Sequence, residues 1–202
     1  MKMKKTLSIL LAAIMLFSFA ACSGNGGSNT TADTTAGTTA APAPALSGTL
    51  EEIADKIYEN ASDFQISIMP ATEIDLTDAD AVNSFLGVAS ADSIERAVFS
   101  EPMIGSIPYS MCLVKVKDGA DKEALKQEIL DGVNYRKWIC VAAEKILVAD
   151  CGDVIMMVMS SEDNVETIYN AFSAVCAGSA SEPMTKAGET EEDIELPEEI
   201  LG

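Results

Sequence analysis

Apolar side chains recur every three or four residues in four stretches of the chain, and this period is that of an amphipathic helix. The first stretch opens with a capping box, in which Thr49 precedes Glu52 by three residues. Asp163 and Glu166 stand in the same relation before the last stretch. The pattern predicts helices over residues 50–58, 78–86, 122–133 and 163–176.

Between these stretches the apolar residues alternate or run together, which is typical of β-strands. Cys151-Gly152 separates two such runs and predicts a hairpin. The second run of the hairpin is apolar on both faces, which favours a central place in the sheet. Strands are expected at 96–100, 109–117, 138–141, 146–149 and 154–159, with a looser one over 64–74 that breaks at Pro70.

The order of these elements predicts an α+β fold. We expect a single two-layer domain, with a mainly antiparallel sheet of about five strands and helices packed on one face. The domain should span residues 49–180. A length of about 130 residues is usual for one domain with one core.

The N-terminal 21 residues follow a different pattern. Three lysines precede an uncharged apolar run over residues 6–19, and small residues lead into Cys22. This layout is typical of a signal peptide over residues 1–21, and Phe19-Ala20-Ala21-Cys22 resembles a bacterial lipobox, whose cysteine is lipidated. We therefore expect acyl chains such as palmitate on Cys22, which would anchor the chain to the cell membrane on its extracytoplasmic face. The alternatives are an ordinary secretory signal and a retained membrane helix, although the run is shorter than the roughly 20 residues that span a bilayer.

Two segments outside the predicted domain have the composition of disordered chain. Residues 22–48 consist, after Cys22, almost entirely of Gly, Ser, Thr, Ala, Asn and Pro, and this composition predicts a tether. Residues 181–202 are crowded with Glu and Asp, and mutual repulsion predicts a disordered acidic tail. The alternative for the tail is a partner-binding helix built on Ile194, Leu196, Ile200 and Leu201.

The charge and the missing residue types exclude several functions. The chain has 32 acidic and 13 basic side chains, a formal net charge of -19, and no histidine. So acidic a protein lacks the basic face that nucleic-acid binding requires. The absence of histidine excludes Ser-His-Asp and Cys-His catalysis in their usual forms and removes the commonest transition-metal ligand. We expect no cofactor and no metal site.

Four cysteines remain besides Cys22, and they allow three complete disulfide pairings. No two of them form a CxxC pair, so neither a zinc knuckle nor a thioredoxin-like motif is present. Each has apolar sequence neighbours, and buried free thiols are therefore the alternative to disulfides. The four are Cys112, Cys140, Cys151 and Cys176.

Three segments resemble a known family. Residues 101–107 read Glu-Pro-Met-Ile-Gly-Ser-Ile, residues 113–121 read Leu-Val-Lys-Val-Lys-Asp-Gly-Ala-Asp, and residues 136–140 read Arg-Lys-Trp-Ile-Cys. With the order of signal, tether and domain, they make the chain similar to Gram-positive lipoproteins that share a domain of unknown function, the DUF4358 type. The resemblance covers roughly residues 50–178. It implies an extracytoplasmic lipoprotein and carries no enzymatic activity with it.

Two segments are candidates for contact with a ligand or partner. Arg136-Lys137-Trp138 is the one locally basic and aromatic segment, and a guanidinium beside an indole suits an anionic or carbohydrate ligand. Pro102, Met103 and Ile104 belong to an apolar loop between two predicted strands, and such loops often carry function. The structural alternatives are that Trp138 anchors the core and that the apolar loop packs over the sheet edge.

The sequence favours a non-enzymatic binding or accessory module that is anchored to the membrane and contacts an envelope protein or a small ligand. The lipobox, the tether and the lack of a catalytic motif all favour this function. The alternative is an envelope hydrolase that uses paired Asp and Glu carboxylates. Such an enzyme needs two carboxyl groups converging in a cleft, one of them with a raised pKa.

Overall fold

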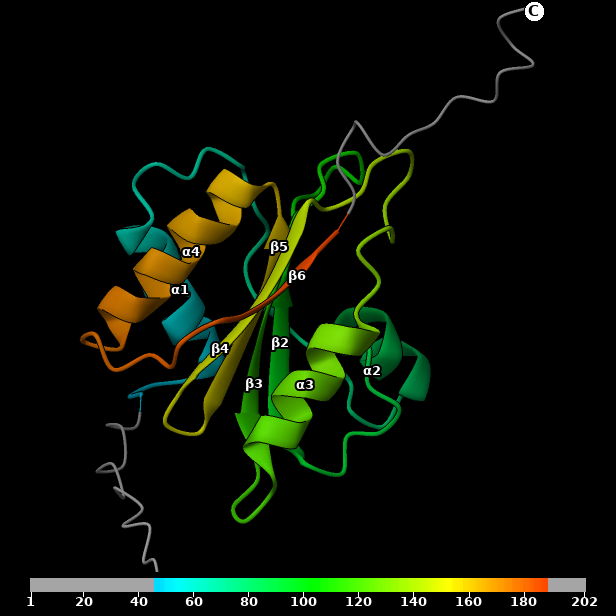
Figure 1. Cartoon of the computed structure of the whole chain (residues 1–202), viewed down its shortest axis with the longest axis vertical. Coiled ribbons are helices and arrows are strands. Elements are labelled where there is room, and N and C mark those ends of the chain that lie inside the picture. Colours follow the sequence, from blue (N-terminus) through cyan, green and yellow to red (C-terminus); the bar gives the residue numbers. More distant parts are fainter. Residues whose placement is uncertain (1–45, 189–202) are drawn as a thin grey trace, which may run out of the picture. The chain divides into compact units, whose positions relative to one another are not determined.

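The computed structural model describes residues 46–188, which form four helices and one six-stranded sheet (Figure 1). The helices are α1 (Leu50–Asn60), α2 (Ala79–Leu86), α3 (Lys122–Gly132) and α4 (Glu162–Val175). The strands are β1 (Thr72–Glu73), β2 (Ile94–Ser100), β3 (Ser110–Val116), β4 (Lys145–Cys151), β5 (Val154–Ser160) and β6 (Met184–Ala187). The predicted signal peptide, Cys22, most of the tether and residues 189–202 lie outside the described residues.

Every neighbouring pair of strands in the sheet is antiparallel, and the spatial order is β1-β2-β3-β5-β4-β6. This confirms the predicted α+β class, the antiparallel sheet and the β4–β5 hairpin. The strand β5 lies between β3 and β4, as its apolar character on both faces predicted. Since all seven residues of β5 are buried, the sheet requires a cover on both sides.

Helices cover both faces of the sheet, and this corrects the prediction of a two-layer domain with helices on one face. Figure 1 shows α1 and α4 on one side and α2 and α3 on the other. The alternation along β3 feeds both layers. Met111 and Leu113 belong to the core under α1 and α4, whereas Cys112 and Val114 belong to the core under α2 and α3. Two amphipathic helices cover each face of the sheet, so the apolar side chains on both faces of the central strands are buried.

The domain extends beyond the predicted boundary at residue 180. Met184–Ala187 forms the edge strand β6, which pairs with β4 from Val148 to Lys145. The connection to it is fixed where the backbone N–H of Ser181 donates to the carbonyl of Asp150 at 2.8 Å. Only residues 189–202 of the predicted disordered tail remain outside the described chain.

Two local predictions were wrong. Residues 138–141 form no strand, because Cys140 has a left-handed backbone conformation with φ of 61°, which interrupts an extended segment. The last helix begins after Ser161 as N-cap, not after Asp163, and Asp163 lies in its first turn. The capping box of Thr49 and Glu52, in contrast, is present at α1 as predicted.

Candidate functional site

Three irregular segments, residues 64–71, 101–109 and 134–143, lie together at one end of the sheet, which we call the loop end (Figure 1). It is the end at which β2 stops and β3 starts. The backbone N–H of Met69 donates to the carbonyl of Glu101 at 2.9 Å, which joins the first segment to the second. An ion pair of Lys137 with Glu101 joins the second to the third. The two segments predicted to contact a partner are therefore neighbours.

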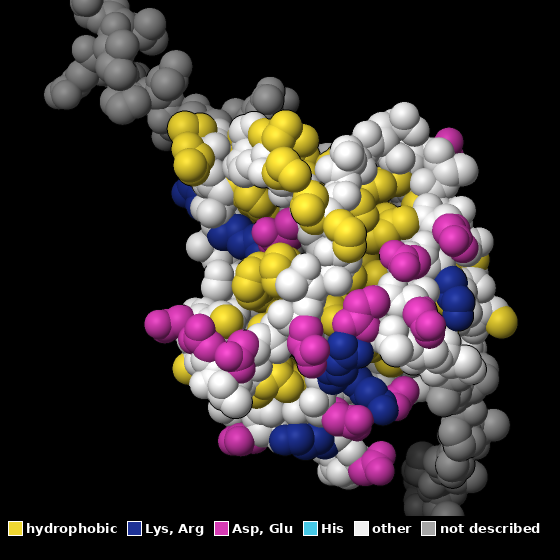
Figure 2. Space-filling view, turned by 180° about the vertical axis from the view of Figure 1, so that it is seen from behind, with side chains coloured by type: hydrophobic (Ala, Val, Ile, Leu, Met, Phe, Trp, Pro, Cys, Tyr) yellow, Lys and Arg dark blue, Asp and Glu magenta, His cyan; other side chains and the backbone are white. Residues whose placement is uncertain are grey.

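The loop end presents apolar side chains to solvent. Within residues 46–188, four large hydrophobic side chains are exposed, and all four belong to its segments: Met69, Met103, Ile104 and Ile139. Met103, Ile104 and Ile139 are 78%, 62% and 79% exposed. Figure 2 shows hydrophobic side chains gathered at the upper end of the molecule, which is the loop end of Figure 1. A clustered apolar surface of this kind is typical of an interaction site.

Met103 and Ile104 were predicted as contact residues, whereas Met69 and Ile139 were missed. Ile139 follows Trp138 in an apolar run that resembles a strand, and the wrong strand prediction hid its exposure. Met69 precedes Pro70, and a proline restricts the backbone of the residue before it. The sequence therefore contained a signal for irregular chain at Met69.

Lys137 lies inside the loop end and not on its surface. Its side chain is 13% exposed, and its ammonium group pairs with Glu101 and lies 3.2 Å from the hydroxyl oxygen of Ser110. The same group lies 5.0 Å from the ring centroid of Phe85 and 5.6 Å from that of Trp138, which are cation–π distances. Lys137 therefore holds two loops together.

Of the remaining predicted contact residues, one is exposed and two are half-buried against other parts of the domain. Arg136 is exposed, and its backbone N–H bonds to the side chain of Asn134 at 3.0 Å. Trp138 is half-buried and packs against the core under α2 and α3, as the structural alternative for it expected. Pro102 is half-buried and forms an isolated bridge with Ile68.

A serine beside a lysine raises the question of nucleophilic catalysis. In such a pair the lysine serves as the base that activates the serine hydroxyl. Ser110 is fully buried, so no substrate reaches its hydroxyl in this conformation. The ammonium of Lys137 is also engaged in an ion pair with Glu101. The arrangement supports the loop end structurally.

Two tyrosines form a support beneath the loop end. The hydroxyl groups of Tyr58 and Tyr109 lie 2.8 Å apart, and the ring centroid of Phe64 lies 4.8 Å from that of Tyr109. Burial raises the pKa of Tyr58 to about 12 and that of Tyr109 well above its ordinary value. Both phenols are neutral near neutral pH, and their contact links α1 to β3.

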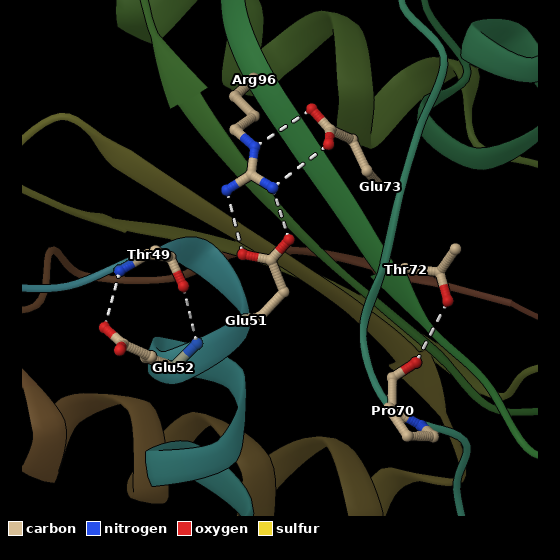
Figure 3. Close-up of polar contacts among 7 residues, drawn as sticks. All are labelled: Thr49, Glu51, Glu52, Pro70, Thr72, Glu73 and Arg96. Atoms are coloured by element: carbon tan, nitrogen blue, oxygen red, sulfur yellow. Dashed lines mark hydrogen bonds and ion pairs between the residues drawn. The ribbon is translucent and has the colours of Figure 1, made fainter.

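At the opposite end of the sheet, Arg96 binds two carboxylates (Figure 3). One guanidinium nitrogen of Arg96 lies 2.9 Å from an oxygen of Glu51 in α1, and another lies 3.1 Å from Glu73 in β1. The hydrogen bonds that Arg96 donates to Glu73 and Glu51 raise the pKa of Arg96. Burial alone would raise the pKa of Glu51, but the hydrogen bonds from Arg96 outweigh it and the pKa is lowered. Glu51 is thus favoured in its ionised form beside Arg96, which does not suit a general acid.

A second ion cluster joins α3 to β4. Asp150, whose side chain is 8% exposed, pairs with Lys122 through one oxygen and with Lys126 at 2.7 Å through the other. Burial opposes ionisation of Asp150, yet the hydrogen bonds from Lys122 and Lys126 lower its pKa. Both lysines come from the same face of α3 at helical spacing, so the cluster fixes that helix on the sheet.

Two cavities of the described chain lie away from the predicted contact residues. A cavity of about 510 Å³ lies between α2 and the start of β2, lined in part by Asp92, Glu95 and Lys117. Asp92 and Glu95 are exposed, and Glu95 pairs with Lys115 at 3.0 Å. The other cavity, of about 200 Å³, has Asp63 as its one acidic residue and lies beside α4. Neither of these two cavities is lined by a buried pair of carboxyl groups.

The four cysteines of the domain are free thiols in this structure. Cys112, Cys151 and Cys176 are buried, as the free-thiol alternative expected, and burial raises the pKa of Cys112 to about 12. Cys140 is exposed on the loop end, contrary to that expectation. Among the described residues, no group of three or more His, Cys, Asp or Glu side chains is arranged to hold a metal ion.

Comparison with protein-family models, curated proteins and solved structures gives no match for this chain. No helix within residues 46–188 is long and apolar enough to cross a membrane.

Proposed function

We propose that the protein is a membrane-anchored extracytoplasmic lipoprotein that acts as a non-enzymatic binding or accessory module. Its lipid anchor would be Cys22, and its contact surface would be the loop end. The observation that carries the proposal is the gathering of four exposed apolar side chains on three neighbouring loops. The resemblance to DUF4358-type lipoproteins supports the anchor and adds no ligand.

The placement of the loop end fits an anchored module. Glu51, in the first turn of α1, pairs with Arg96 near the start of β2, whereas the loop end follows Ser100 at the other end of that strand. The chain thus enters the domain at the end opposite to the loop end (Figure 1). A flexible tether between Cys22 and α1 would be attached at the end of the domain opposite to the loop end and would leave the apolar surface free to meet another envelope component.

The size of the surface indicates a transient contact. Complete burial of one aliphatic or methionine side chain contributes about 1.5–3 kcal/mol. Association costs about 4–15 kcal/mol before any contact is counted. Four such side chains, already partly in contact with the domain, therefore support reversible binding. Recruitment of both molecules to one membrane would strengthen the contact by raising their effective concentration.

The anchor is tested by metabolic labelling with an alkyne-tagged palmitate in the native host. We expect label on the wild-type chain and none on Cys22→Ala, because the lipobox cysteine is the acceptor. Equal label on the two chains, or none on either, would contradict the lipoprotein assignment.

The contact surface is tested by affinity purification of the tagged, natively lipidated protein from solubilised membranes. The test variant replaces Met103, Ile104 and Ile139 by serine, and the control replaces the exposed polar residues Asp55 and Gln127 by serine. We expect a stoichiometric envelope partner that is retained by the control and lost from the test variant. Equal recovery with both variants would place the contact elsewhere on the chain.

The hydrolase alternative is supported only by the cavity that contains Asp92 and Glu95. If the protein hydrolyses an envelope polymer there, Asp92→Asn and Glu95→Gln abolish that activity while the loop-end variant retains it. Loss of a partner and loss of an activity are thus separate outcomes.

A further inference from the structure

We propose that the loop end binds the chain's own C-terminal segment, residues 189–202, within the same molecule. This inference does not depend on an external partner. It concerns which peptide chemistry the loop end accepts and where that peptide comes from.

The described chain ends beside the loop end. In the β4–β6 pairing Ala187 lies opposite Lys145, the first residue of β4, and the backbone N–H of Gly188 donates to the carbonyl of Glu144 at 2.8 Å. A Cβ at Gly188 would lie 1.8 Å from the carbonyl oxygen of Ala143, so the backbones touch there. Figure 1 shows β6 running toward the loops of this end. Gly188 therefore lies next to the segment that carries Ile139.

The segment is long enough to cover the surface. An extended chain spans about 3.3–3.6 Å per residue, so the 14 residues after Gly188 reach about 45 Å. Ile194 comes six residues after Gly188 and is within about 20 Å of it. All four of its large aliphatic residues are thus within reach of the exposed side chains: Ile194, Leu196, Ile200 and Leu201.

The chemistry of the segment matches the loop end better than it matches any other described surface. Seven of its 14 residues are Asp or Glu, and the aliphatic residues are interspersed among them. The three segments of the loop end carry two basic side chains, Arg136 and Lys137, and one acidic side chain, Glu101. In a chain of net charge -19 these three segments together carry a net charge of +1. An acidic peptide with apolar side chains meets there both apolar contacts and less repulsion than over the chain as a whole.

The covalent connection makes a weak contact sufficient. A short flexible link holds a segment at an effective concentration in the millimolar range, so an intrinsic dissociation constant of about 0.3 mM already gives predominant occupancy. The bound segment would compete with any external ligand of the loop end. A partner must displace the bound segment, so its apparent affinity for the loop end is reduced. The segment would therefore regulate the surface.

The test compares hydrogen exchange in three full-length or truncated chains, each reconstituted in nanodiscs of zwitterionic lipid. They are the full chain, a chain that ends at Gly188, and a full chain in which the four aliphatic residues of the segment are replaced: Ile194→Ser, Leu196→Ser, Ile200→Ser and Leu201→Ser. The third chain keeps every acidic residue. The turn at residues 117–121, at the opposite end of the sheet, serves as an internal control.

In the full chain we expect amides of residues 101–109 and 134–143 to exchange at least about threefold more slowly than in the truncated chain, because an occupied surface is protected most of the time. The serine variant should exchange like the truncated chain, and the control turn should be the same in all three. Equal exchange at the loop end in all three chains would overturn the proposal. Protection that appears only as protein concentration rises would also overturn it, since the occupant would then be a second copy.

A synthetic peptide with the sequence of residues 189–202 gives an independent readout. It should bind the chain that ends at Gly188 and bind the full chain about fourfold more weakly, because the internal segment competes. A scrambled peptide of the same composition is the control. Equal binding of the peptide to both chains would contradict an internal occupant, while the membrane purification above would still test the external one.

Discussion

Gly87 and Gly132 bring α2 and α3 into direct backbone contact. Gly87 follows α2 as its C-cap with φ of 71°, and a Cβ there would lie 2.2 Å from the carbonyl carbon of Gly132. A Cβ at Gly132 would in turn lie 2.0 Å from the carbonyl oxygen of Gly87. No side chain fits between the two backbones, so this contact sets how closely both helices lie on the sheet.

Substitution of Gly87 should therefore be far more costly than loss of conformational freedom alone. Gly119 is the matched control, because its φ is 78° and nothing lies within 4 Å of a Cβ placed on it. We expect Gly119→Ala to lower the free energy of unfolding by about 1 kcal/mol. We expect Gly87→Ala to lower it by about 3 kcal/mol or more, since overpacking is added to the backbone strain. Urea denaturation measures both, and equal losses would contradict the close approach.

Asp150 makes a pH-dependent contribution to stability. Its pKa is lowered in the folded protein, so its contribution is present above the pKa of the unfolded chain and is lost as the pH falls through the folded pKa. Removal of the charge also leaves Lys126, whose side chain is 4% exposed, with Glu123 as its remaining carboxylate partner in the cluster.

We expect Asp150→Asn to lower the free energy of unfolding by about 3 kcal/mol near pH 7, as is usual for a broken buried ion pair. The difference from wild type should shrink below about pH 4, where the unfolded chain takes up protons. Asp131→Asn is the control, because Asp131 is exposed and its side chain accepts a hydrogen bond from the neutral amide of Gln127 at 2.9 Å. A difference that is independent of pH would contradict the role of the ionised carboxylate.

At the scale of elements, the sequence predicts best where burial dictates the pattern. The β4–β5 hairpin follows from apolar runs around Cys151-Gly152, and α1 follows from its capping box and stripe. Helices on both faces were implied by the two-sided burial of β5 but were not predicted, because a helix stripe does not say which face it covers. The strand β6 was missed because its four residues stand among acidic neighbours and gain stability only from pairing with β4.

The candidate site was predictable only where its features are local in the sequence. Exposure of Met103 and Ile104 follows from an apolar loop with proline and glycine, a local feature. The ion pair of Lys137 with Glu101 joins positions 36 residues apart and depends on the β2–β3 connection meeting the chain before β4. Such a contact is set by the fold and has no local signal.

The strand β6 should be needed for stability although it lies at the sheet edge. A chain that ends at Ala180 loses β6, exposes the backbone edge of β4 and uncovers part of the core where Met184 packs. We expect its free energy of unfolding to be lower by about 2 kcal/mol and its tendency to aggregate to be higher.

A chain that ends at Gly188 is the control for this truncation. It keeps β6 and should unfold within about 1 kcal/mol of the full chain, since only a weakly held segment is removed. Circular dichroism during thermal unfolding measures both chains. Equal stability of the chains that end at Ala180 and at Gly188 would contradict a structural role of β6.

At the scale of the whole molecule, the two ends of the sheet have different chemistry. The end where α1 begins is tied by Arg96 to the carboxylates of Glu51 and Glu73. The loop end carries exposed aliphatic and methionine side chains with little net charge. This polarity along the strands puts the exposed apolar side chains at the end of the sheet opposite to the start of α1.

The most direct test of this account is site-specific photo-crosslinking of the full chain in intact cells. A photoreactive amino acid is placed at Ile104 or Ile139 of the loop end, and at Asp55 and Gln127 on helices of the two faces as controls. The account predicts defined adducts, with an envelope protein or with residues 189–202, from positions 104 and 139 only. Adducts of equal yield from the control positions, or none from the loop end, would contradict the claim that the loop end is the binding surface.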